Sequence, residues 1–435
     1  MKLSRRLLPV VGALGIAALS ACGTTATPAS SSSGGGGGTS LASCQGTITV
    51  ATDLPLTGGD ATDGPPVEKA AHLAVTQANT AKTLGGCTLK YVSKDDATVL
   101  KNGHDPAQGA ANITALSSDQ SVVGVVGPFN SSVAVAEIPV ASQNHLALIS
   151  PSNTNPGLTQ AGTNPDVNTA SLYPGPHTYF RTIGTDITQG QILSYVAQTE
   201  LKFTKAYAID DQETYGRGLS TFFQKYFAQD GGTIVGTASL PGSTKDFHTQ
   251  IADAQSKGAQ VIFFGGTSGN GCGILRSQMP AGLPELGGDG CQDDKFITDA
   301  GSNSAGAEVT SAPDASKLST ATTFYSDFQT AYSEPGTESP YTPYGYDAMN
   351  GLIQAIKAVL VANNGQPPSD AMTFRDDVVE QLHKLSYSGA TGTVAFDANG
   401  DTTHAGFSLY TISGTKWAPK ELLTADATGK VSVSG

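Results

Sequence analysis

Short apolar runs alternate with longer segments of helical hydrophobic spacing along most of the chain. Strands are predicted at the short runs, 48–51, 89–92, 122–126, 146–149, 206–209, 234–236, 261–264 and 296–298. Helices are predicted at the spaced segments, 67–81, 107–116, 133–142, 191–201, 219–229, 247–257, 324–332 and 346–361. This alternation over two consecutive stretches predicts an α/β protein with two parallel sheets, each with helices on both faces. Residues 393–396 and 407–412 flank an Asn-Gly pair, which predicts a hairpin.

The N-terminus has the pattern of an export signal. Three basic residues, Lys2, Arg5 and Arg6, precede an apolar stretch at 7–19, so residues 1–21 are predicted to be a signal peptide. The sequence Leu-Ser-Ala-Cys that ends at Cys22 resembles the lipobox of bacterial lipoproteins, in which the signal is cut before a cysteine that carries a lipid. The alternative is an ordinary signal peptide with an incidental cysteine. Residues 22–43 then comprise the lipidated cysteine and a flexible Ser/Gly-rich linker.

This N-terminus predicts an exported protein, anchored by lipid to the outer face of the cell membrane. Four further cysteines, Cys44, Cys87, Cys272 and Cys291, allow three disulfide pairings. Cys44 and Cys87 each precede a predicted strand, and the other two lie in successive Gly-rich turns, so Cys44–Cys87 and Cys272–Cys291 are the predicted bridges. A four-thiolate metal site is the alternative, but no Cys-x-x-Cys spacing is present, and disulfides suit an exported protein.

Charge and composition exclude several classes of function. The formal net charge is −13, which disfavours general electrostatic binding to nucleic acid or to an anionic membrane. Beyond the N-terminus no stretch approaches the roughly 20 apolar residues that cross a bilayer. The Gly-rich segment 265–273 fits neither a phosphate-binding loop nor a nucleophile elbow, and the histidines lack His-x-x-x-His zinc spacing. We therefore expect no enzyme activity, no cofactor and no metal.

The loops that follow the predicted strands are rich in glycine and small hydroxyl residues, with isolated acids. Ligands of open α/β sheets bind at the carboxyl ends of the strands, where these loops lie. Backbone N–H groups and hydroxyls at helix N-termini suit a carboxylate, and a lone acid with carbonyl oxygens suits an ammonium. The loops therefore predict a zwitterionic ligand.

Four loop motifs carry a resemblance to a known family. They are GPFNSS at 127–132, LISPSNTNP at 148–156, YGRG at 215–218 and KDF at 245–247. Over residues 47–412 the chain resembles the substrate-binding proteins of branched-chain amino acid (Leu/Ile/Val-type) ABC importers, which have the type I periplasmic-binding-protein fold. The resemblance implies two lobes joined by three crossovers, with a ligand cleft between them. Lobe 1 is expected to comprise 45–181 plus 313–385, and lobe 2 to comprise 182–312 plus 386–435.

The resemblance also implies which residues contact the ligand. Ser131 and Thr154 would hold the carboxylate, and the Ser152 carbonyl and Asp289 would hold the ammonium. The remaining predicted contacts are Tyr215, Thr267, Ser268, Asp63 and one of two aromatics, Tyr341 and Tyr344, of which Tyr344 is the predicted one. Structural alternatives are helix capping by Ser131, turn formation at Thr154 and Asp289, and packing between the lobes by Tyr215.

Two departures from the family leave the ligand's side chain open. Asp63, and Thr267 or Ser268, stand where relatives commonly carry tyrosines. An unpaired acid in an aliphatic pocket is costly, so either Asp63 points to water or the ligand is not leucine-like. The expected ligand is an amino acid, an amide or a similar small polar compound, delivered by a monomeric protein to an ABC permease. The alternative function is a ligand sensor on the same fold that signals to a partner protein.

Overall fold

Two β-sheets flanked by helices form the framework of the residues that the structure, a computed structural model, describes (41–426 and 428–434). The predicted signal peptide and Cys22 lie outside the described residues. Among the described residues, no helix is both long enough and apolar enough to cross a membrane. The last residues of the predicted linker, Leu41–Ser43, form a 3-10 turn, and the Leu41 carbonyl accepts a hydrogen bond from Cys44 N–H.

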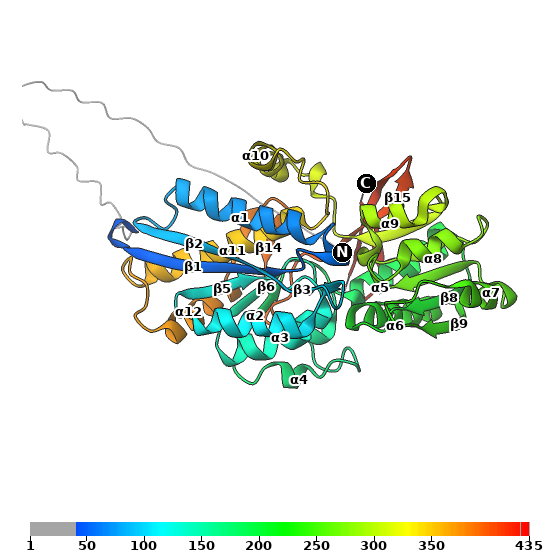
Figure 1. Cartoon of the computed structure of the whole chain (residues 1–435), viewed down its shortest axis with the longest axis horizontal. Helices are drawn as coiled ribbons and strands as arrows, with labels where there is room; N and C mark the ends of the chain where they lie inside the picture. The colour runs from blue at the N-terminus through cyan, green and yellow to red at the C-terminus, as the bar shows by residue number, and fades with distance from the viewer. Residues whose placement is uncertain (1–40, 427, 435) are drawn as a thin grey trace, which may run out of the picture. The chain divides into compact units, whose positions relative to one another are not determined.

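The first sheet is entirely parallel and has the strand order β2-β1-β5-β6-β7. Its strands are β1 (Gly46–Leu54), β2 (Cys87–Asp95), β5 (Val122–Val126), β6 (Ala147–Ser150) and β7 (Tyr179–Arg181). Buried side chains of α1 (Gly64–Thr80), α11 (Thr342–Ala362) and α12 (Ala371–His383) pack on one face. Those of α2 (Pro106–Ser118) and α3 (Ser131–Gln143) pack on the other (Figure 1). Because both faces are covered, every residue of β5 is buried.

The second sheet has the order β17-β16-β15-β12-β11-β10-β8-β9 and is parallel over five strands. These strands are β8 (Lys205–Asp210), β9 (Thr233–Ser239), β10 (Val261–Gly265), β11 (Glu285–Gly287) and β12 (Ala307–Ser311). Three antiparallel strands extend the sheet beyond β12, namely β15 (Phe407–Ser413), β16 (Lys416–Ala425) and β17 (Val431–Ser434). The expectation of a wholly parallel second sheet therefore holds for its first five strands only.

Helices cover both faces of the second sheet as well. Buried side chains of α5 (Asp186–Tyr195) and α6 (Thr214–Gln229) share one hydrophobic cluster with it. Those of α7 (His248–Ser256), α8 (Cys272–Gln278) and α9 (Asp294–Ala300) share another. The remaining elements are α4 (Thr169–Leu172), α10 (Thr322–Tyr332), the β3–β4 ribbon (Ala97–Thr98 and Gly103–His104) and β13–β14 (Ser386–Gly389 and Gly392–Ala395). The two-lobed α/β fold class expected from the sequence is confirmed.

Two predicted elements are wrong. Residues 296–298 lie in helix α9, because the Asp293 side chain caps this helix by accepting a hydrogen bond from Phe296 N–H. A short apolar run cannot by itself separate a strand from a buried helical turn. The predicted strands 393–396 and 407–412 do not pair with each other either, because β14 pairs with β13 and β15 pairs with β12 and β16. Around the Asn-Gly pair the chain turns back only as far as an isolated antiparallel bridge between Phe396 and Thr402.

Both predicted disulfides are confirmed. Cys44–Cys87 joins the residues before β1 to the start of β2, and Cys272–Cys291 joins the start of α8 to the turn after β11. The predicted lobe boundaries stay a prediction. Val394 and Phe396, beyond the predicted end of lobe 1 at residue 385, pack in the core of the first sheet.

Candidate functional site

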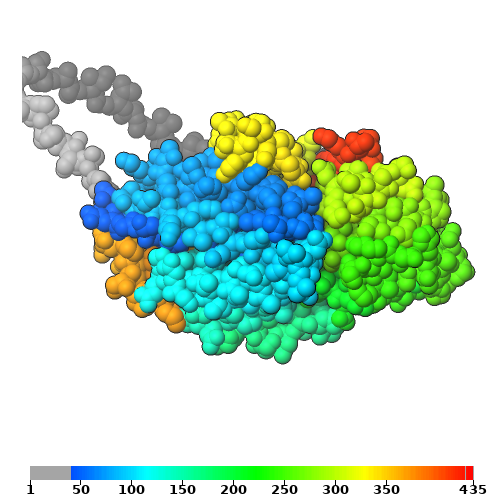
Figure 2. All heavy atoms as spheres, in the orientation of Figure 1, coloured from blue at the N-terminus to red at the C-terminus, as the bar shows by residue number. Residues whose placement is uncertain are grey.

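A small cavity of about 40 Å³ lies where loops of the two sheets meet. Each contributing loop follows a strand or leads into α11, and both sheets contribute, as expected for open α/β sheets that face each other. Figure 2 shows the surface of residues 50–150, in blue to cyan, meeting that of residues 200–300, in green. The lining residues are Asp60, Asp63, Phe129, Asn130, Ser131, Ser152, Tyr215, Thr267, Ser268, Gly269, Asp289, Gly290, Asp293 and Tyr341.

The N-terminus of α3 contributes a free hydroxyl to this cavity. Ser131 is the first residue of the helix and only 2% exposed, yet its Oγ has no hydrogen-bond partner among the described residues. The N-cap position belongs to Asn130, whose side chain makes no capping hydrogen bond. The capping alternative for Ser131 is therefore not what the geometry shows. A hydroxyl beside unpaired helical N–H groups can bind an anion such as a carboxylate.

Asp289 lines the cavity from the second sheet and accepts hydrogen bonds from two tyrosines. Tyr215 Oη donates to Asp289 Oδ1 at 2.8 Å, and Tyr341 Oη donates to Oδ2 at 2.5 Å. Burial raises the pKa of Asp289, and the hydrogen bonds from the two phenols oppose that rise. Each carboxylate oxygen keeps a second lone pair, so Asp289 can still accept a hydrogen bond from a bound cation.

Further contacts join the two sides of the cavity. Tyr341 comes from the start of α11, which packs on the first sheet, whereas Asp289 follows β11 of the second. Thr62 Oγ1 donates to Asp293 Oδ2 at 3.1 Å in the same way. The rings of Phe129 and Tyr341 meet edge to face, 5.2 Å apart, and form the aromatic part of the wall.

Acidic side chains make up much of the polar lining. Burial raises the pKa of Asp63 well above its usual value, and the nearby Asp293 raises it further. Burial opposes the ionisation of Asp60 as well, but His104 outweighs it and holds the pKa of Asp60 below its usual value. His104 Nδ1 lies 2.9 Å from Asp60 Oδ2. Burial alone would lower the pKa of His104, but the Asp60 carboxylate raises it to about 9.

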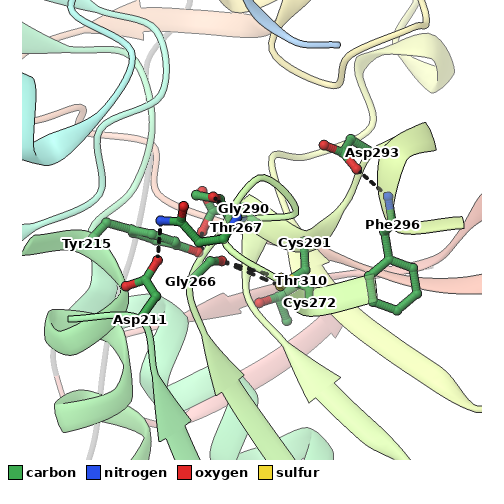
Figure 3. Close-up of a disulfide and its surroundings, with 12 residues drawn as sticks. Asp211, Tyr215, Gly266, Thr267, Cys272, Gly290, Cys291, Asp293, Phe296 and Thr310 are labelled. Carbon is green, nitrogen blue, oxygen red and sulfur yellow. Dashed lines mark hydrogen bonds between the residues drawn. A yellow bond between two sulfur atoms is a disulfide. The ribbon is translucent and has the colours of Figure 1, made fainter. Parts of the chain in front are cut away.

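The Cys272–Cys291 disulfide fixes two of these loops against each other. Figure 3 shows Thr267, Tyr215 and Gly290 grouped beside this bridge. Ser268 N–H donates to the Gly290 carbonyl at 2.8 Å, so the loop after β10 is also bonded to the turn that carries Asp289. The bridge therefore holds this part of the cavity wall together.

All predicted ligand-contact residues except Thr154 and Tyr344 line the cavity, and their contact with a ligand stays a prediction. Thr154 is fully buried, and its carbonyl accepts the Asp186 N–H at 2.7 Å. Tyr344 Oη instead donates to the Pro313 carbonyl at 3.3 Å, in a different cavity. The choice of Tyr344 over Tyr341 is corrected, because Tyr341 is the aromatic that reaches Asp289.

Sequence reasoning did not single out four lining residues with side chains, Asp60, Phe129, Asn130 and Asp293. Phe129 and Asn130 stand inside the GPFNSS motif, and Asp293 comes shortly after Cys291, so proximity to predicted residues was the available signal. Nothing in the sequence indicated that His104, in the β3–β4 ribbon, would pair with Asp60. Asp63 lines the cavity, and whether its carboxylate meets a ligand or water there stays a prediction.

Comparison with known proteins places this geometry in context. Leu/Ile/Val-binding protein homolog 1 of Brucella suis biovar 1 (strain 1330) is 28% identical over 365 residues, which cover 83% of this chain and 90% of that protein. The branched-chain amino acid transporter substrate-binding protein LivJ from Streptococcus pneumoniae, solved with isoleucine, superposes with a TM-score of 0.72 at 22% identity, covering 89% of this chain and 99% of that one.

A solute-binding protein of an ABC transporter from Rhodopseudomonas palustris HaA2, solved with p-hydroxybenzoic acid, has a TM-score of 0.70 at 19% identity. It covers 87% of this chain and 97% of its own. The family model described as "Periplasmic binding protein" matches residues 47–416, a range that contains every residue lining the cavity. Because this family model matches well over half of the chain and includes the whole site, this chain belongs to the periplasmic binding protein family.

Proposed function

We propose that this chain is the substrate-binding protein of an ABC importer and that its cavity takes an amino acid or a related small zwitterion. The observation that carries the proposal is the pairing of Ser131 with Asp289 across one cavity. Ser131 offers a buried, unpartnered hydroxyl at a helix N-terminus, and Asp289 offers a buried carboxylate. A helix N-terminus binds the carboxylate of a small zwitterion, and an acidic side chain binds its ammonium, so the two residues together suit such a ligand.

The relatives support the importer role but leave the ligand open. The solved neighbours of this fold hold an aliphatic amino acid in one case and an aromatic acid in another, so the fold does not decide the ligand. The residues of this chain must decide it. We propose contacts from Ser131, Ser152 and Asp289 to the zwitterion and from Phe129 and Tyr341 to its apolar part.

In this proposal the protein binds its ligand and releases it unchanged. It acts outside the cytoplasm and is anchored to the membrane through Cys22. The N-terminal signal pattern and the lipobox-like Leu-Ser-Ala-Cys support this location. Both disulfides are consistent with an oxidising compartment. The anchor would keep the protein beside the permease that receives the ligand.

Thermal-shift screening of the purified protein against amino acids, amides and short peptides tests the ligand class. A ligand at 100 times its Kd should stabilise the protein by about 2.7 kcal/mol. A saturable shift with at least one amino acid, with the compound recovered unchanged, is expected. The absence of a shift with any member of the panel, or chemical conversion of the compound, would contradict the proposal. Loss of uptake of the same compound on deletion of the gene separates an importer from a sensor, which would leave uptake intact.

A further inference from the structure

The cavity carries an excess of acid. Four aspartates line it, Asp60, Asp63, Asp289 and Asp293, and no lysine or arginine is among its lining residues. Like charges repel one another strongly at short range where water screens them poorly. Four carboxylates around so small a cavity therefore need compensation by cations or by protons.

A protein cation compensates one of the four, and the ligand is assigned to a second. His104, 2.9 Å from Asp60, neutralises that carboxylate. Asp289 accepts hydrogen bonds from two phenols and is the proposed partner of the ligand's α-ammonium. This assignment leaves Asp63 and Asp293 without a cationic partner.

Asp63 and Asp293 receive hydrogen bonds from neutral donors only, and one oxygen of Asp63 receives none. Asp293 accepts from Phe296 N–H at 2.8 Å and from Thr62 Oγ1 at 3.1 Å. Asp63 Oδ1 is buried and has no hydrogen-bond partner among the described residues. Such a carboxylate oxygen costs free energy unless a donor reaches it, and a charge-assisted donor is the strongest one.

The arrangement favours an organic cation over a metal ion. Among the described residues, the one group of three or more His, Cys, Asp or Glu side chains whose ligand atoms all lie within 4.8 Å of one another is Asp53, Asp96 and Glu137, which line no part of this cavity. No three of the cavity aspartates form such a group. A ligand with charged groups at both ends of an apolar chain can reach separate acids and place its chain against Phe129 and Tyr341.

We propose that the ligand is a cationic amino acid, whose side-chain ammonium or guanidinium binds between Asp63 and Asp293. This inference rests on the proposed function, because Ser131 and Asp289 must take the zwitterionic end. Ser131 is only 2% exposed, and its Oγ has no hydrogen-bond partner among the described residues. This hydroxyl is independent evidence that the cavity binds a polar ligand. Burial raises the pKa of both Asp63 and Asp293 when no cation is near, so binding of a cation would favour their ionised forms.

Isothermal titration calorimetry of the purified protein with three compounds tests this inference. L-Lysine has both charged ends, L-norleucine lacks the side-chain ammonium, and cadaverine lacks the carboxylate. We expect L-lysine to bind at least tenfold more tightly than either of the others. Asp63→Asn should weaken L-lysine binding at least tenfold and change L-norleucine binding less than threefold. Asp294→Asn, an exposed acid next to Asp293, makes the same change in net charge and should leave both affinities unchanged.

The outcomes separate this inference from the proposed function. If L-norleucine binds as tightly as L-lysine, the cationic site is refuted while amino acid binding stands. If cadaverine binds and no amino acid does, the acidic pair binds cations but the proposed zwitterion site is refuted. If none of the three binds, the inference fails. The comparison of L-lysine with L-norleucine uses the unaltered protein, so it remains decisive even if Asp63→Asn does not fold.

Discussion

Removing the Cys272–Cys291 disulfide should loosen the cavity wall as well as destabilise the protein. Cys272 begins α8 after the β10 loop, and Cys291 ends the short 3-10 turn that begins with Asp289. Without the bridge, the backbone hydrogen bond from Ser268 N–H to the Gly290 carbonyl would still join these two segments. The double substitution Cys272→Ala and Cys291→Ala removes the bridge without burying a new polar group.

The magnitudes follow from the loops that the two disulfides close. Cys272–Cys291 spans 19 residues, so its loss should lower the free energy of unfolding by about 3 kcal/mol. Cys44–Cys87 spans 43 residues, and its loss should cost about 4 kcal/mol. Cys44–Cys87 lies at the amino ends of β1 and β2, away from the carboxyl ends that line the cavity. Removal of this second bridge is therefore the matched control.

Urea denaturation followed by circular dichroism gives the two stabilities, and calorimetry with the amino acid that gives the largest thermal shift gives the affinities. We expect the variant without Cys272–Cys291 to bind about tenfold more weakly, because binding must then order the two loops at a cost of about 1.4 kcal/mol. The control variant should bind like the unaltered protein although it is the less stable of the two. Equal affinities in both variants, or losses that follow stability alone, would refute a positioning role for the Cys272–Cys291 bridge.

Three further substitutions probe the site and the core. Asp289→Asn keeps the size of the side chain but removes its charge, so amino acid affinity measured by calorimetry should fall by about 2–5 kcal/mol, and wild-type affinity would refute its role. Burial raises the pKa of Glu137 well above its usual value, and the charges of Asp53 and Asp96 raise it further, so the stability that the protonated form provides is lost as pH rises. The free energy of unfolding of Glu137→Gln, measured by urea denaturation, should therefore rise relative to that of the unaltered protein as the pH increases from 5 to 8. A difference between the two proteins that does not change with pH would contradict this. Arg181→Met leaves the buried Asp401 without its partner at 2.6 Å and should cost about 3–5 kcal/mol in the same assay, so a loss below 1 kcal/mol would contradict it.

The sequence predicted the loops of the site better than it predicted individual side chains. Hydrophobic periodicity located β5 and β6, and the rule that ligands bind at strand carboxyl ends then selected the loops that carry Ser131 and Ser152. Asp289 came from the family resemblance, because the short strand before it, β11, was not predicted. Cysteine positions predicted both disulfides, because each pair stands beside neighbouring strands or turns.

Residues positioned by tertiary packing were beyond the reach of this reasoning. Tyr341 and Tyr344 stand three positions apart at the start of α11, and only the placement of that helix decides which one faces Asp289. His104 pairs with Asp60 because a two-residue ribbon brings it there, and no periodicity marks so short an element. The run at 296–298 lies in α9, which begins after the N-cap Asp293, and so short an apolar run does not by itself distinguish a strand from a helix.

A crystal structure of the protein with bound L-lysine tests most directly how the cavity recognises its ligand. We expect the α-ammonium nitrogen within about 3.2 Å of an Asp289 oxygen and the carboxylate at a similar distance from Ser131 Oγ. The side-chain ammonium should lie between Asp63 and Asp293. A ligand bound with its carboxylate toward Asp289, or bound outside this cavity, would contradict the proposed recognition.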